Sequence, residues 1–211
     1  MRASDRHSIG APFTVADWEN LKIDYAAYLK DPSVENVNKV CAVMTGITEK
    51  RQTATPLPES KKSPNEVTWY MPPEGKAEGK TVDYMLANLK VLEKRVKEGH
   101  RPSILLALKL REIHDGGEFG EDLDILLDSL IHSNSRLFLE GLKENGKVVE
   151  NPEDLDELIS FMGAPFADEE GQPQKEYAFR IRDLQKVKAP ELMSLRDKCI
   201  KVLKAEIGKA S

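Results

Sequence analysis

Four side chains that can bind metals or transfer protons recur at helical spacing near the middle of the chain. They follow one another at intervals that place them on one face of a helix: Glu121, Asp124, Asp128 and His132. Three carboxylates and an imidazole could bind a hard or borderline divalent metal if a second element supplied further ligands. An amphipathic helix also places its solvated charges on the face opposite its leucine stripe. We interpret the set first as a solvated face, with a metal site as the alternative, and predict no cofactor.

The remaining reactive residue types form no recognisable catalytic motif. Cys41 and Cys199 are the only cysteines, and both lie on apolar helical stripes. This favours buried free thiols, although one long-range disulfide is the alternative. His114 and Asp115 precede two glycines, a pattern typical of a helix C-cap. Phosphate-binding loops and the G-x-S-x-G nucleophile motif are absent from the chain, so we predict no catalytic residue.

The elements that position these side chains are predicted to be helices almost throughout. Thr14 and Asp17 have capping-box spacing at the start of the first helix. The run ILLALKL over 104–110 is apolar nearly all round, which predicts the most buried helix. Ser133 and Asn134 offer a cap to a further helix. We predict an all-α fold, an irregular helical array or bundle of about eight or nine helices in αα-hairpins. These form one domain over 12–208 behind a flexible N-terminus of residues 1–11.

Residues 47–80 interrupt the helical pattern. Five prolines lie in this stretch, at a density that prevents regular helix: Pro56, Pro58, Pro64, Pro72 and Pro73. We predict a long Pro-rich loop or extended insertion within the domain. Trp69 and Tyr70 belong to its only apolar piece. They either pack onto the helices or form part of an exposed recognition loop.

Predicted helix starts recur at a nearly constant interval between residues 102 and 163. This rhythm resembles the paired helices of α-solenoid repeats such as HEAT and armadillo proteins. The resemblance concerns spacing only, because no consensus residues recur from one pair to the next. An irregular bundle explains the same spacing.

Composition narrows the classes of function. The chain has 211 residues, of which 40% are hydrophobic, and a net charge of −5, which argues against a general nucleic-acid binder. No apolar run is long enough to span a membrane. The first eleven residues lack the apolar core of a signal peptide. A chain beginning after a removed signal would look the same, so the compartment stays open.

The charge is distributed unevenly. Residues 115–176 carry 4 basic and 17 acidic side chains, whereas 81–114 and 177–211 have net charges of +3 and +5. Basic helices could pack beside acidic ones, or an acidic face could bind a basic partner. The second interpretation predicts a non-enzymatic protein–protein interaction module. Its alternatives are a metal-binding protein or enzyme and an inhibitor or immunity-type protein for a basic partner. The candidate contact residues are Trp69, Tyr70, Glu118, Glu121, Asp122, Asp154, Asp156 and Glu157.

Overall fold

The computed structural model describes residues 14–53, 73–113, 117–146, 149, 152–161 and 173–209. Within these ranges the chain forms nine helices and no strand, which confirms the predicted all-α helical array. The helices are α1 (Val15–Lys30), α2 (Val34–Thr53), α3 (Pro73–Ala87), α4 (Leu89–Lys97), α5 (Arg101–Ile113), α6 (Gly117–Glu144), α8 (Pro152–Phe161), α9 (Pro173–Leu184) and α10 (Pro190–Lys209). Among them, none combines the length and the apolar character that crossing a bilayer requires.

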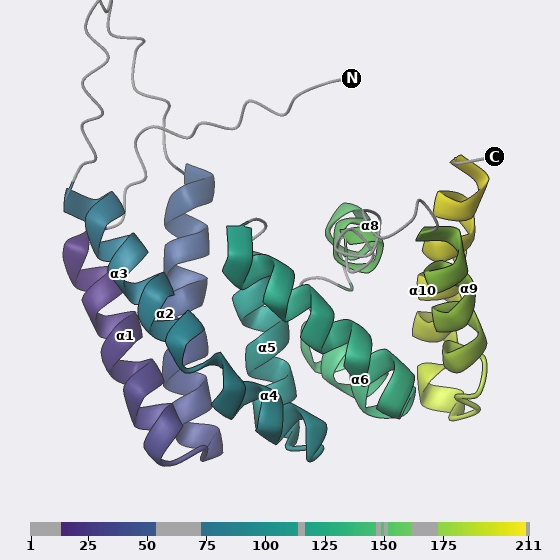
Figure 1. Cartoon of the computed structure of the whole chain (residues 1–211), viewed down its shortest axis with the longest axis horizontal. Coiled ribbons are helices and arrows are strands. Elements are labelled where there is room, and N and C mark those ends of the chain that lie inside the picture. Colours follow the sequence, from purple (N-terminus) through teal and green to yellow (C-terminus); the bar gives the residue numbers. More distant parts are fainter. Residues whose placement is uncertain are drawn as a thin grey trace, which may run out of the picture.

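The array runs from α1, α2 and α3 at one end of the molecule, through α4, α5 and α6, to α8, α9 and α10 at the other (Figure 1). α1 packs against both α2 and α3, α2 packs against α5, and α5 packs against α6. α6 in turn contacts α9, and α10 closes the far end by packing on α9 and α8. Helix α6 is therefore the element that joins the two ends of the array.

Local sequence signals account for where several helices begin and end. The Thr14 backbone N–H donates to Asp17 Oδ2 at 2.8 Å, as the predicted capping box requires. Asn134 interrupts α6 with φ −156° and ψ 72°, and its Oδ1 accepts a hydrogen bond from the Leu137 N–H at 3.1 Å. The predicted cap at Asn134 is thus confirmed, and it divides α6 into two helical halves.

One continuous apolar core runs through the array. Its centre is α5, where Ile104, Leu106 and Leu108 are fully buried, as the apolar run predicted. Gly141 in the second half of α6 lies against this helix, and a Cβ there would come within 2.7 Å of Ile104 Cγ2. The close approach of α5 and α6 therefore requires glycine at this position.

The predicted loop over 47–80 is wrong at both ends, because α2 continues to Thr53 and α3 begins at Pro73. α2 runs through Gly46, because an isolated glycine in a helix costs only about 1 kcal/mol and no breaker follows it directly. Proline fits the first helical position, which explains the start of α3. Residues 54–72, including Trp69 and Tyr70, lie outside the described residues, as does the N-terminus of residues 1–13.

Both cysteines are free thiols, as the first interpretation predicted. Burial raises the pKa of Cys41 to about 11 and that of Cys199 to about 12. The thiolate form, which is the reactive one, is therefore scarce at neutral pH.

Candidate functional site

The four candidate residues on α6 do not form one site. Glu121 is exposed to solvent, whereas Asp124 and Asp128 are each only 4% exposed. The solvated-face interpretation is therefore wrong for these two aspartates, because neighbouring helices pack against this face of α6. Each one meets a cation from a different helix.

Asp124 pairs with α5. The Arg111 Nε lies 2.6 Å from Asp124 Oδ1, and both side chains are almost completely buried. Burial raises the pKa of Asp124, and the hydrogen bond and the charge of Arg111 oppose this rise. The pair provides a polar contact within the otherwise apolar packing of α5 and α6.

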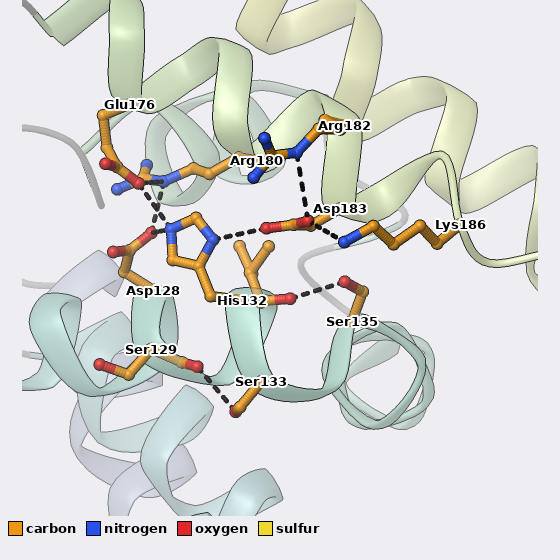
Figure 2. A network of polar contacts seen from close by, with 11 residues as sticks. Asp128, Ser129, His132, Ser133, Ser135, Glu176, Arg180, Arg182, Asp183 and Lys186 are labelled. Carbon is orange, nitrogen blue, oxygen red and sulfur yellow. Dashed lines mark hydrogen bonds and ion pairs between the residues drawn. The ribbon is translucent and has the colours of Figure 1, made fainter.

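Asp128 pairs with α9. The Arg180 Nε lies 2.5 Å from Asp128 Oδ1 and 3.7 Å from Glu176 Oε1, and the Arg180 side chain is fully buried. Burial raises the pKa of Asp128 as well, against the opposing charge of Arg180. A guanidinium group from α9 thus lies between two carboxylates from different helices (Figure 2).

Both ring nitrogens of His132 face carboxylates of α9. Nδ1 donates to Asp183 Oδ2 at 2.7 Å, and Nε2 donates to Glu176 Oε1 at 2.6 Å (Figure 2). Since an ionised carboxylate only accepts hydrogen bonds, this geometry requires a hydrogen on each nitrogen, that is, the imidazolium form. Partial burial lowers the pKa of His132, but the hydrogen bonds to Asp183 and Glu176 outweigh it and hold the pKa above its ordinary value.

Asp183 completes this arrangement at the end of α9. Its carboxylate also lies 2.5 Å from the Lys186 Nζ and 3.7 Å from the Arg182 Nε. Burial raises its pKa, but the hydrogen bonds and charges of Lys186 and His132 prevail, and the pKa of Asp183 is lowered. We call these residues the α6–α9 network: Asp128, His132, Glu176, Arg180, Asp183 and Lys186.

Three atoms of the network could in principle face one metal ion. Asp128 Oδ1, His132 Nε2 and Glu176 Oε1 all lie within 4.8 Å of one another. However, Nε2 already donates to Glu176, and the buried Arg180 guanidinium pairs with both carboxylates. A cation of the protein itself therefore occupies the position that a metal would take, and the geometry fits ion pairing better than metal binding.

A cavity of about 510 Å³ adjoins the network where α6 is interrupted, with His132, Ser133 and Ser135 on its lining. The hydroxyls of Ser133 and Ser135 donate to carbonyls of their own helix, at 2.7 and 2.6 Å. Neither of them bonds to His132, whose nitrogens are already engaged. Within the described part of the chain, this cavity therefore contains no serine activated by a histidine, which general-base catalysis of acyl transfer would require.

The predicted contact residues are found in several places. Glu118 and Glu121 are exposed at the start of α6, Asp122 is half-buried beside them, and Asp156 and Glu157 are exposed on α8. Asp154 lies in α8, but its side chain, like Trp69 and Tyr70, falls outside the description. The residues that sequence reasoning missed are on α9. Glu176 lies in the first turn of α9, which begins at Pro173.

The signal for the network is present in the α9 sequence. Glu176, Arg180 and Asp183 follow one another at steps of four and three residues, so they share a face of α9 just as their partners share a face of α6. Matching the charged face of α6 with that of α9, acid against base, could have predicted that these two helices pack together. No protein-family model, curated protein or solved structure matches this chain, so the functional argument depends on its own geometry.

Proposed function

We propose that this protein is a non-enzymatic helical interaction module that binds a basic segment of a partner protein. The proposed contact surface is the acidic turn, defined as Glu118, Glu121 and Asp122 at the start of α6. One observation carries the proposal: the carboxylates of α6 that neighbouring helices cover are paired internally, whereas those of the acidic turn face solvent.

The paired carboxylates have partners from both basic regions of the sequence. Arg111 of α5 binds Asp124, and Arg180 of α9 binds Asp128. Arg101, the first residue of α5, pairs in the same way with Glu140 of α6. Internal compensation therefore neutralises these three carboxylates of α6, which are not available to a substrate or partner.

The acidic turn has no such compensation. Within the described part of the chain, no Lys, Arg or His lies at ion-pair distance from Glu118, Glu121 or Asp122. Ile125 follows Glu121 by one helical turn and is 41% exposed, which adds an apolar contact beside the charges. Glu118 lies in the first turn of α6, where the helix dipole stabilises an acidic side chain by about 0.3–1 kcal/mol.

A surface of this kind fits a segment in which lysine or arginine alternates with apolar residues. Exposed charges mainly accelerate and select encounters, while the apolar contact contributes to affinity. Binding should accordingly weaken as the salt concentration rises, because exposed charges are screened.

The test compares two triple variants as immobilised baits in extract from the source organism. Glu118→Lys/Glu121→Lys/Asp122→Lys reverses the acidic turn. Glu19→Lys/Asp24→Lys/Asp83→Lys makes the same charge change on α1 and α3, with two exposed residues and one half-buried residue in each set.

We expect the native chain and the α1/α3 variant to retain a stoichiometric partner that elutes with salt, and the acidic-turn variant to lose it. Circular dichroism confirms that each bait is folded. Equal capture by all three baits, or a partner held unchanged at high salt, would contradict the acidic turn as the contact surface.

A further inference from the structure

The other end of the array carries an open groove of opposite charge. The groove has a volume of about 640 Å³ and lies between the α9–α10 connection and α10. Four basic side chains and one acidic side chain line it: Lys188, Arg196, Lys201, Lys204 and Asp197. We call this the lysine groove, and Ile200 and Gln185 complete its lining.

The single acidic group of the groove is already neutralised. The Asp197 carboxylate lies 2.7 Å from Arg196 Nη2 and accepts a hydrogen bond from Arg196 Nε at 2.8 Å. Arg196 also donates from Nη1 to the Val187 carbonyl at 2.8 Å, which fixes the guanidinium against the α9–α10 connection. The Arg196–Asp197 pair therefore lines the groove without contributing net charge. Among the described residues, the uncompensated charges of the groove are those of the three lysines.

Some lysines of other helices are paired with an acid. Lys39, Lys94 and Lys97 each pair with a glutamate four residues away, at 2.8 to 3.9 Å. Lys201 and Lys204, one turn apart on α10, have no acidic partner within the described ranges, and neither has Lys188. Like charges one turn apart destabilise a helix by a few tenths of a kcal/mol. What distinguishes these three lysines is that they line one groove and concentrate positive charge in it.

We propose that the lysine groove binds an extended acidic segment, rich in aspartate or glutamate, of a partner protein. Carboxylate side chains would pair with the three lysines, and the buried Ile200 would underlie the segment. The groove suits a peptide better than a nucleic acid, because no aromatic side chain lines it for base stacking. A net charge of −13 over residues 115–176 would also repel a long polyanion. This site is separate from the acidic turn and has the opposite preference.

The experiment measures the fluorescence anisotropy of a fluorescein-labelled octaglutamate peptide titrated with the full chain. We expect saturable binding that weakens as salt is raised from about 20 to about 200 mM. Lys188→Glu/Lys201→Glu/Lys204→Glu should reduce the affinity about tenfold or more. Lys90→Glu/Lys94→Glu/Lys97→Glu on α4 is the control, because it makes the same change in net charge with three lysines that do not line the groove.

Three results would overturn the proposal. The first is no saturable binding by the native chain, or equal loss in both variants once circular dichroism shows that they are folded. The second is tighter binding of a labelled oligothymidylate through the same lysines, which would assign the groove to nucleic acid. The third is self-association in sedimentation velocity that the groove variant abolishes, which would make a second copy of this chain the occupant.

Discussion

Arg180 of α9 extends to Asp128 of α6 so that the two charged groups meet at 2.5 Å with both side chains almost completely excluded from solvent. Such a pair contributes little net stability compared with apolar residues of the same size, because both charges lose their hydration. Removing one partner lowers the stability strongly, because the remaining charge stays buried without its nearest counter-ion. This asymmetry leads to the first prediction.

Asp128→Ala should lower the free energy of unfolding by about 3–5 kcal/mol, because it removes the nearer carboxylate from the buried Arg180 guanidinium and leaves the more distant Glu176 to pair with it. The double variant Asp128→Leu/Arg180→Met should recover most of that loss. Urea denaturation of the native chain, Asp128→Leu, Arg180→Met and the double variant gives the coupling energy between the two sites. Additive losses would show that the pair is not coupled.

The second prediction concerns pH and His132. Its folded-state pKa is raised above the ordinary value of 6.5, so the stabilisation is complete below that pH and is lost as the pH rises through the folded pKa. His132→Gln supplies only one donor to the two carboxylates. The stability difference between the native chain and this variant should therefore be largest in mild acid and decline toward alkaline pH.

His100 provides the control for this measurement. Its Nδ1 lies 2.7 Å from the Ser103 hydroxyl, an uncharged partner that can either donate or accept. The stability difference caused by His100→Gln should not follow the pH profile of His132→Gln. Parallel profiles for the two variants would contradict the role assigned to the paired carboxylates.

Two glycines should respond in opposite ways to alanine. No atom outside the local helix lies within 4 Å of a Cβ built at Gly46, so Gly46→Ala should gain about 0.5–1 kcal/mol from helix propensity. Gly141→Ala places its methyl group against Ile104 and should lose about 1–3 kcal/mol through overpacking. Thermal unfolding should show a higher midpoint for the first variant and a lower one for the second. A higher midpoint for both would mean that α5 and α6 separate readily.

The fourth prediction separates ion pairing from metal binding in the α6–α9 network. Because Arg180 and the His132 imidazolium already pair with Asp128 and Glu176, EDTA and divalent zinc, manganese or magnesium should leave the thermal midpoint unchanged at constant ionic strength. A midpoint that rises with one metal, and no longer rises in His132→Gln, would restore the metal site.

The sequence was most informative where a signal is local. The capping box at Thr14 and the cap at Asn134 depend on contacts within three residues, and both were predicted correctly. The end of α2 at Thr53 and the start of α3 at Pro73 were predicted wrongly, because glycine and proline mark an interruption of helix without defining its exact bounds. Helix existence therefore followed from periodicity, whereas helix length depended on packing that a periodic pattern does not encode.

Only the α6 part of the candidate site could be predicted from the sequence. The α6 residues were found by their spacing, but their environment depends on α9, which lies more than forty residues further along the chain. The charge asymmetry of the sequence did indicate that basic helices compensate acidic ones, and the pairs of Arg111 and Arg180 agree with this. The packing of the helices determines which aspartate each arginine binds, and the sequence alone does not specify it.

The alternation of charge along α9 restricts how this helix can seat on α6. If α9 slid by one turn in one direction, Glu176 would occupy the place of Arg180 and face Asp128 as a like charge. A slide in the other direction would bring Leu184 to that place and leave Asp128 buried beside a hydrocarbon side chain. Both alternative registers are therefore unfavourable, so the α6–α9 network selects a single alignment of the two helices. Leucine contacts alone would specify this alignment less well, because one leucine can replace another after a shift of one turn.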